Sequence, residues 1–161
     1  MNTPSPTTRH KQLVQLILDV ATQRLDLQLP DGTTSSYPVS TSKFGLGSEE
    51  GSFRTPTGHF RIYAKFGENS PAWMGFKGRK PTGVIASPGG EEDLILSRIL
   101  WLEGLDPENS NTRDRYIYIH GTNQEDLIGT PASHGCIRLR NNQMIELFDL
   151  VEEGTPLLIK A

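Results

Sequence analysis

The alternation of apolar and polar residues along the chain predicts a fold made mostly of β-strands. Residues 12–18 are apolar and β-branched, and residues 23–29 alternate strictly, with three leucines on one face. A period of two is the pattern of a half-buried strand. After a Pro-Asp-Gly turn, residues 33–40 are expected to return as an edge strand, because Pro38 has no N–H for a central ladder. Together these segments predict a β-meander.

Further strands are expected along the rest of the chain. Residues 59–65 alternate, residues 83–87 (GVIAS) resemble a short buried strand, and residues 156–159 resemble a closing strand. Residues 93–102 fit either a strand or a helix that is apolar on most sides. We favour a strand that forms an antiparallel hairpin with residues 116–120.

Two long connections carry glycine and proline in place of a regular pattern. Residues 41–57 are predicted to be a connection, and residues 66–82 are predicted to be an irregular loop. Long loops without periodicity often serve as lids, so we expect residues 66–82 to form a flap over a cleft. The alternative is a surface loop that Trp73 anchors by packing against the body of the protein.

One helix is predicted near the C-terminus, over residues 142–153. Its apolar positions follow the helical spacing i, i+3, i+4, i+7 and are Met144, Leu147, Phe148 and Val151. Asn141 or Asn142 is expected to cap its start, and Gly154 is expected to end it.

Length and charge narrow the class of protein. A chain of 161 residues fits one domain, which we place at residues 12–161 behind a flexible N-terminal segment of residues 1–11. The 16 basic and 19 acidic residues nearly balance, so the charge indicates neither a nucleic-acid nor a membrane partner. The apolar stretch of residues 13–20 is too short to span a bilayer.

The start of the chain bears on location. The polar, proline-rich beginning does not resemble a signal peptide, so a cytoplasmic protein is expected, or a periplasmic one if an export signal has been lost.

The candidate chemistry lies around the only cysteine of the chain. Cys136 follows His134 by two residues and precedes Arg138 by two, and His120 lies upstream with fifteen residues between it and Cys136. A thiol with an ordinary pKa is only about 3% thiolate at pH 7, and the thiolate is the nucleophile. A nearby imidazole can activate the thiol as a base, or as imidazolium in an ion pair.

Local patterns place groups around this thiol. Alternation puts Tyr116, Tyr118 and His120 on one face of a strand. Gly135 permits a tight turn with positive φ, so that successive backbone N–H groups converge near the sulfur as an oxyanion site. Arg138 would stand close by as a bidentate clamp for a carboxylate.

Two other interpretations of the same residues remain open on spacing alone. His120, His134 and Cys136 have side chains that ligate zinc, with His59 as a fourth candidate. Close-spaced ligand pairs are usual at fixed zinc sites, and only His134 and Cys136 are close in sequence. The plainest alternative is a buried, inert cysteine in a turn with two unrelated histidines.

The residues around the cysteine resemble a known family. His120-Gly121, followed by Ser133-His134-Gly135-Cys136-Ile137-Arg138, is similar to the signature of the L,D-transpeptidase catalytic domain (the YkuD family). Upstream, residues 54–60 (RTPTGHF) resemble the family's TPTG-x-F segment. The two motifs occur in the family's order, and the resemblance covers roughly residues 12–160.

This resemblance implies a mostly β fold, an L,D-transpeptidase-like sandwich of mixed sheets with one C-terminal helix and the cysteine loop at a cleft. It implies that Cys136 attacks the carbonyl of meso-diaminopimelate in a peptidoglycan stem tetrapeptide and expels the terminal D-alanine. His120 would be the base, oriented through the backbone carbonyl of Gly121. The oxyanion hole would consist of the amides of His134, Gly135 and Cys136.

The resemblance also bears on substrate contacts and cofactors. It implies that the substrate site is lined by Ser133, His134 and Arg138, with Gly121 and Tyr118 beside them. Neither a metal nor an organic cofactor is implied, and the partners are peptidoglycan stem peptides or muropeptides.

Three functions follow as expectations. Because no export signal is seen, an L,D-carboxypeptidase of muropeptide recycling, with water as the acyl acceptor, comes first. The alternative is an L,D-transpeptidase that forms 3–3 cross-links or exchanges D-amino acids. A non-catalytic module that binds wall fragments is the third.

Overall fold

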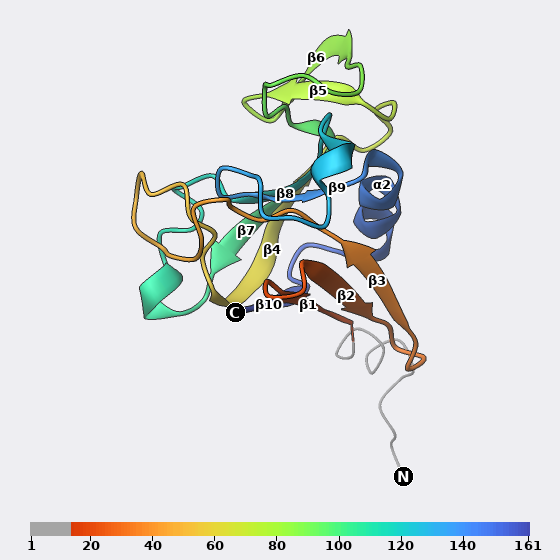
Figure 1. The fold of residues 1–161 in the computed structure, drawn as a ribbon. Coiled ribbons are helices and arrows are strands. Elements are labelled where there is room, and N and C mark those ends of the chain that lie inside the picture. Colours follow the sequence, from red (N-terminus) through yellow and green to blue (C-terminus); the bar gives the residue numbers. More distant parts are fainter. Residues whose placement is uncertain (1–13) are drawn as a thin grey trace.

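A computed structural model describes residues 14–161, which form one curled, mixed sheet of ten strands (Figure 1). Hydrogen bonds connect the strands in the order β3-β2-β1-β10-β4-β7-β5-β6, and β8 lies between β7 and β9. The strands are β1 Gln15–Asp19, β2 Arg24–Gln28, β3 Thr34–Pro38, β4 Gly58–Phe66, β5 Met74–Lys77, β6 Lys80–Ile85, β7 Leu96–Gly104, β8 Tyr118–Gly121, β9 Ile137–Leu139 and β10 Pro156–Lys160.

The predicted meander is confirmed, and so is the position of β3 at an edge. β1, β2 and β3 pair antiparallel in chain order, and β10 adds to the other side of β1 in parallel. The curl brings the chain after β3 back to β9. There Ser40 and Arg138 exchange two backbone hydrogen bonds of 2.9 and 3.0 Å. The two ends of the sheet are therefore tied together at the strand that follows the cysteine.

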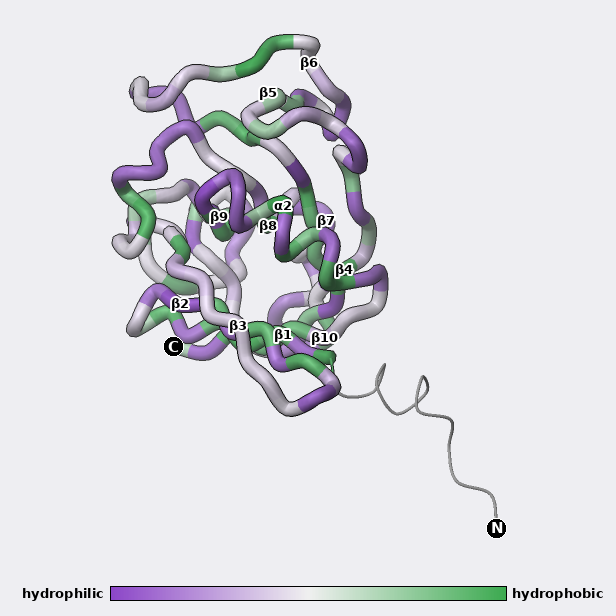
Figure 2. The backbone as a smooth tube through the Cα atoms, turned by 90° about the vertical axis from the view of Figure 1, so that its right-hand side faces the viewer, coloured by the Kyte–Doolittle hydropathy of each residue, from purple (hydrophilic) through white to green (hydrophobic). Residues whose placement is uncertain are grey.

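The main core fills the inside of this curl. Alternate residues of β1, β2, β4 and β10 point inward and meet the apolar face of the helix α2 (Asn141–Leu150). Figure 2 shows hydrophobic stretches gathered in the region of β1, β3 and β10. The helix positions predicted as apolar are all buried: Met144, Leu147, Phe148 and Val151. The predicted fold class, mostly β and L,D-transpeptidase-like with one C-terminal helix, is confirmed, and in place of a sandwich of separate mixed sheets the strands form one continuous curled sheet.

The segment of residues 66–82 is not an irregular loop, because most of its second half is a β-hairpin. β5 and β6 pair antiparallel, and the hairpin joins the rest of the sheet through the single pair of Gly75 and Leu96. It projects from the top of the molecule in Figure 1. The strand expected at 83–87 is present up to Ile85 as the end of β6, but it is not buried, since Val84 and Ile85 are 65% and 52% exposed. Within residues 14–161, no other strand or helix packs over β6, and all of its residues are exposed.

The ambiguous apolar run is a strand, as favoured, and it carries a bulge. β7 pairs antiparallel with both β4 and β8, and its register with β8 shifts between Leu96 and Ile99. Ser97 lies in this bulge with φ of +72°. Its hydroxyl donates to Asn141 Oδ1 at 2.6 Å and accepts the Trp73 N–H at 2.9 Å. The bulge therefore anchors the helix start and the approach to the hairpin.

The prediction that Asn141 or Asn142 caps the start of the helix is wrong. Arg140 takes the N-cap position and makes no capping side-chain bond. Asn141 is instead the first helical residue, and its side chain is buried against Ser97, Thr122 O and Glu125. The amide of Asn141 thus joins the helix to β7 and to the turn after β8.

The helix also ends earlier than the sequence indicated. It stops at Leu150, where Val151 turns to an extended conformation, and Gly154 lies beyond it in a turn. Lys65 Nζ donates to the carbonyls of Phe148 and Val151 at 2.6 and 2.7 Å. A cation at the C-terminal end satisfies carbonyl groups that lack helical partners, so no glycine is needed to end the helix.

The expected flexible segment of residues 1–11 lies outside the described residues. Within residues 14–161, no helix has the length and apolarity needed to cross a bilayer.

Gly104 tests how tightly β7 packs against the loop after it. A Cβ there would overlap the backbone carbonyl of Asn109, which cannot move aside as a side chain can. We expect Gly104→Ala to lower the free energy of unfolding by about 2–3 kcal/mol, measured by urea denaturation followed by circular dichroism. Gly47→Ala is the matched control, because its new methyl would meet only the flexible Arg54 side chain. Equal stability of the two variants would contradict the expected packing.

Candidate active site

The parallel pairing of β8 and β9 sorts their side chains onto two faces. Ile119 is opposite Ile137, and His120 is opposite Arg138. Paired and alternate positions of adjacent strands share a face. The two isoleucines point into the main core. His120 and Arg138 therefore lie on the opposite face, together with Tyr118 and with Cys136, the residue just before β9.

The Cys136 sulfur lies against the end of the strand opposite it. Sγ accepts the Tyr118 N–H at 3.3 Å and donates to the carbonyl of Tyr116 at 3.5 Å. The residue is half-buried and packs against a small apolar cluster centred on Phe76, Ile99 and Tyr118. Burial raises the pKa of the thiol to about 12, although the Tyr118 N–H favours the anion. The resting group is a neutral thiol.

His120 is almost wholly buried, with 2% of its surface exposed. Its Nδ1 lies 2.6 Å from the carbonyl oxygen of Gly121. A carbonyl only accepts, so Nδ1 carries the hydrogen and Nε2 keeps a free lone pair. Burial lowers the pKa of the imidazole, which favours the neutral base at neutral pH. The Gly121 carbonyl thus orients the ring in the way that the family resemblance implied.

The loop before the cysteine is held by buried hydroxyl groups. Gly135 has φ of +124°, the conformation expected for a tight turn. Ser133 is fully buried, and its hydroxyl donates to the Cys136 carbonyl at 2.6 Å and accepts the Gly135 N–H at 3.2 Å. Thr55 Oγ1 donates to the Gly135 carbonyl at 3.0 Å. The two sequence motifs therefore meet in space, since Thr55 belongs to the upstream one.

Arg138 lies in the protein interior with no exposed surface. Its Nη1 contacts Asp93 Oδ1 at 2.9 Å and Gln124 Oε1 at 2.6 Å, and its Nη2 contacts Ser40 Oγ at 3.1 Å. The arginine does clamp a carboxylate, as its type suggested, but in this structure the carboxylate belongs to Asp93 of the same chain.

Asp93 is the site residue that the sequence did not reveal. Its second oxygen, Oδ2, lies 3.2 Å from His134 Nδ1, so one carboxylate joins His134 to Arg138. Burial disfavours the charged form, but electrostatic interaction with His120 and with the Arg138 guanidinium, together with hydrogen bonds from His134 and Arg138, outweighs it and lowers the pKa of Asp93. In the sequence Asp93 follows two glutamates in a glycine-rich stretch, where nothing distinguishes it from its neighbours.

Hydrogen bonds from Asn123 hold the segment that carries Asp93, residues 89–94, in place. Its side chain donates to the carbonyls of Gly89 and Glu92 at 2.8 and 2.9 Å and accepts the N–H of Leu94 at 3.1 Å. Asn123 follows β8 closely and is buried. The strand that carries His120 therefore also positions the loop that carries Asp93.

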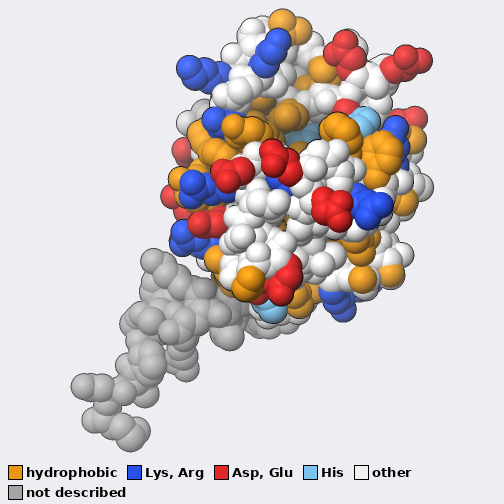
Figure 3. Space-filling view, turned by 90° about the vertical axis from the view of Figure 1, so that its left-hand side faces the viewer, with side chains coloured by type: hydrophobic (Ala, Val, Ile, Leu, Met, Phe, Trp, Pro, Cys, Tyr) orange, Lys and Arg blue, Asp and Glu red, His pale blue; other side chains and the backbone are white. Residues whose placement is uncertain are grey.

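Two groups of aromatic side chains belong to the site. In the group that packs with the cysteine, Trp101 stacks with Tyr116 at a centroid distance of 6.0 Å and meets Tyr118 edge-on at 6.1 Å. In the group beside His134, the rings of Phe44 and Phe53 lie 6.0 and 6.1 Å from the exposed ring of that histidine. Figure 3 shows histidine atoms beside hydrophobic side chains on the upper part of one face.

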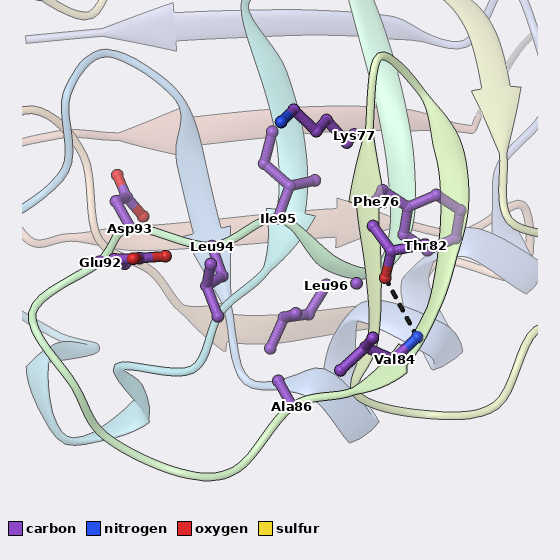
Figure 4. Close-up of a pocket in the computed structure, with 11 residues that line it drawn as sticks. Phe76, Lys77, Thr82, Val84, Ala86, Glu92, Asp93, Leu94, Ile95 and Leu96 are labelled. Carbon is purple, nitrogen blue, oxygen red and sulfur yellow. Dashed lines mark hydrogen bonds between the residues drawn. The ribbon is translucent and has the colours of Figure 1, made fainter.

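A cavity of about 460 Å³ opens between the β5–β6 hairpin and the segment leading into β7 (Figure 4). Leu94, Leu96, Val84 and Ala86 supply apolar surface, and Asp93 lies at one end. Because Asp93 also contacts His134, this cavity borders the cysteine site through that carboxylate.

The zinc interpretation grouped His120, His134 and Cys136, with His59 as a fourth candidate. In the structure His59 is on β4, where its Nδ1 lies 3.3 Å from Asp106 Oδ2. Among residues 14–161 no three histidine, cysteine or acidic side chains are grouped so that they could hold a metal ion.

The Cys136 thiol, the oriented His120 imidazole and the turn at Gly135 lie together on a curled mixed sheet, and this arrangement suits cysteine acyl transfer. A family model described as the L,D-transpeptidase catalytic domain (YkuD) matches residues 14–159. The chain belongs to this family and is an L,D-transpeptidase-type enzyme.

Relatives with curated names have similar sequences. The putative L,D-transpeptidase YqjB of Bacillus subtilis is 31% identical over 145 residues, which is 89% of this chain and 69% of the relative. The probable L,D-transpeptidase ErfK/SrfK of Escherichia coli is 31% identical over 157 residues, covering 89% of this chain and 43% of that protein. The chain thus spans less than half of the second relative.

Solved structures share the fold at lower sequence identity. L,D-transpeptidase 3 from Mycobacterium tuberculosis, in complex with a faropenem-derived adduct, superposes with a TM-score of 0.60 at 14% identity. The alignment covers 92% of this chain and 60% of that one. The L,D-transpeptidase from Xylanimonas cellulosilytica gives a TM-score of 0.57 at 21% identity, over 91% of this chain and 60% of that one.

The raised pKa of Cys136 predicts slow alkylation of the resting enzyme. Because burial raises that pKa to about 12, the rate constant with iodoacetamide should rise about tenfold per pH unit from pH 7 to pH 10 without levelling. Free cysteine, with a pKa near 8.5, is the control and should level above about pH 9. Mass spectrometry measures the rate, and a plateau below pH 9 would show that the folded protein maintains a thiolate.

Asp93→Asn should affect stability and the pH profile together. Asp93 has a lowered pKa, so its ion pair stabilises the fold above the ordinary carboxyl pKa of about 3.9 and is lost as the pH falls through the lower folded value. Weakening a buried pair costs about 3 kcal/mol. We expect that loss at pH 7 in urea denaturation, and a smaller one near pH 3.

The same substitution removes a negative charge that raises the pKa of both His120 and Cys136. The acid limb of the profile of kcat/KM against pH should therefore move to lower pH. Glu92→Gln, which neutralises the exposed neighbouring residue, is the control and should leave stability and profile unchanged. A profile in Asp93→Asn that coincides with the wild type would show that Asp93 is not coupled to the base.

Proposed function

We propose that the protein cleaves the bond between meso-diaminopimelate and D-alanine in peptidoglycan tetrapeptide stems, through a thioester on Cys136. The observation that carries this proposal is the β8–β9 register. It puts the Cys136 thiol and the His120 imidazole on one face, and the Gly121 carbonyl leaves Nε2 of that imidazole free. The family membership supports the substrate class.

The proposed reaction begins from a neutral pair. His120 Nε2 takes the proton as Sγ attacks the carbonyl carbon of diaminopimelate. Backbone N–H groups of His134, Gly135 and Cys136 would stabilise the resulting oxyanion, each contributing about 3 kcal/mol in known acyl transfers. Gly135 N–H donates to Ser133 Oγ in the resting structure, so it would exchange a weak 3.2 Å bond for an anionic acceptor.

Collapse of the tetrahedral intermediate breaks the carbon–nitrogen bond. His120 returns its proton to the departing amine, so free D-alanine leaves and a thioester remains on Cys136. His120 then deprotonates the acceptor that attacks the thioester, and the sulfur recovers its proton. Both halves of the reaction need only one base and one thiol, and no step uses a cofactor.

Water is the acceptor that we favour, which makes the enzyme an L,D-carboxypeptidase of muropeptide recycling. The base that must activate the acceptor is 2% exposed, and the thiol is half-buried. Narrow access favours the smallest nucleophile. The alternative acceptor is an amine, which would give a 3–3 cross-link or an exchanged D-amino acid. A non-catalytic binding module is the third possibility, and the cytoplasmic location remains a prediction.

Cys136→Ala should abolish release of D-alanine from a disaccharide-tetrapeptide, by about 10⁴-fold or more in kcat, while circular dichroism shows an unchanged fold. Product mass analysis with and without an added D-amino acid identifies the acceptor. Tripeptide alone supports the carboxypeptidase, and exchanged or dimeric products would indicate the transpeptidase.

A pair of histidine variants provides the control for the base. His120→Gln should lose activity as Cys136→Ala does, whereas His59→Gln should keep it, since His59 is exposed and pairs with Asp106. Binding of the fragment without any turnover by the wild type would leave only the binding module.

A further inference from the structure

Arg79 lies at the tip of the β5–β6 hairpin and folds back onto a group of aromatic rings. The two-residue turn places it between Lys77 and Lys80 with φ of +63°. Its guanidinium carbon lies 4.4 Å from the centre of the Trp101 ring, 5.6 Å from that of Tyr116 and 6.0 Å from that of Phe66. A guanidinium on aromatic faces is held in a defined plane.

The same aromatic residues border the nucleophile. Arg79 Nη1 donates to the Tyr118 hydroxyl at 3.0 Å, and the N–H of Tyr118 contacts Cys136 Sγ. The Arg79 guanidinium lies over the ring of Tyr116, and the backbone carbonyl of Tyr116 accepts a hydrogen bond from the Cys136 thiol. Arg79 and Cys136 therefore share two neighbours, although they come from segments far apart in sequence.

Arg79 also has donors to spare, whereas Arg138 and Arg115 are held by several partners within the chain. Arg138 is fully buried and is bound by Asp93, Gln124 and Ser40. Arg115 donates to two backbone carbonyls and a serine hydroxyl. Arg79 is half-buried, and within residues 14–161 no acidic side chain forms a salt bridge with it. A guanidinium has five N–H donors, so most remain available.

We infer that Arg79 binds the carboxylate of the terminal D-alanine in the substrate stem, which rests on the proposed function. That carboxylate is separated from the scissile carbonyl by one nitrogen and one carbon atom, within about one residue length, or 3.8 Å. Arg138 cannot bind the substrate carboxylate while its guanidinium is paired with Asp93. Arg79 presents a planar fork that matches a carboxylate, and the rings that hold it reduce the ordering needed on binding.

The inference makes Arg79 specific for the acid form of the substrate. The test compares kcat/KM for a tetrapeptide stem with that for the same stem ending in a D-alanine amide. The wild type should prefer the free acid by about tenfold or more, the effect of one charge-assisted hydrogen bond. Arg79→Gln should reduce this preference to near unity, and Arg79→Lys should retain part of it.

The ratio of kcat/KM for the free acid to kcat/KM for the amide is taken within each variant. This ratio separates carboxylate binding from folding, because a loss of folded protein lowers both kcat/KM values alike. Lys77→Gln and Lys80→Gln remove exposed charges from the same hairpin and should keep the preference. Arg113→Gln removes another guanidinium from an aromatic ring, that of Tyr63 at 4.2 Å, and should also keep it. An unchanged ratio in Arg79→Gln, or no preference in the wild type, would overturn the inference.

A second assay distinguishes failure of this inference from failure of the proposed substrate. A carbapenem repeats the order carbonyl, nitrogen, carbon, carboxylate, so its acylation of Cys136 can be followed by mass spectrometry with the free acid and with its methyl ester. Arg79→Gln should slow acylation by the acid about tenfold and leave that by the ester unchanged. If the wild type releases no D-alanine but shows this acid preference, the peptide substrate is wrong and the carboxylate site stands. Equal effects on acid and ester would refute the carboxylate site.

Discussion

The register between β8 and β9 is the constraint on which the site depends. Parallel pairing puts Ile119 opposite Ile137, and both side chains are committed to the core. A slip of one residue would turn these isoleucines outward and send His120 into the core. The burial of Ile119 and Ile137 on one face of these two short strands therefore determines that His120 and Arg138 lie on the other face. Hydrophobic burial, which is not directional in itself, becomes directional here because strand geometry couples one face to the other.

A buried ion pair then connects segments that the sheet alone does not. Arg138 follows the cysteine on β9, and Asp93 belongs to the loop before β7. Such a pair gains little stability over an apolar contact, because both charges lose their hydration. In this site the pair serves to position the loop that carries Asp93 against β9. The Asp93 carboxylate holds His134 and favours protonation of His120, so a single buried charge orients one imidazole and tunes the other.

Sequence patterns identified the strands and the reacting groups better than the connections between them. Period-two alternation is local, so it revealed the meander, and the position of His120 relative to Cys136 followed from it. Val84 and Ile85 were misread as buried, because an apolar run does not show whether a second layer will cover it. Asp93 was missed for a different reason. Its partner is 45 residues away, and only the folded chain shows which of three adjacent acids reaches it.

The electrostatics of the resting site argue for activation by the substrate. Burial raises the pKa of the Cys136 thiol and lowers that of His120, and both shifts favour the uncharged pair. An ion pair held at rest would need strong donors near the sulfur, and the Tyr118 N–H is one weak donor at 3.3 Å. Proton transfer becomes favourable only when the sulfur bonds to a carbonyl carbon and the negative charge moves to an oxyanion. A neutral resting thiol favours reaction with acyl compounds that the site can orient over reaction with nonspecific electrophiles.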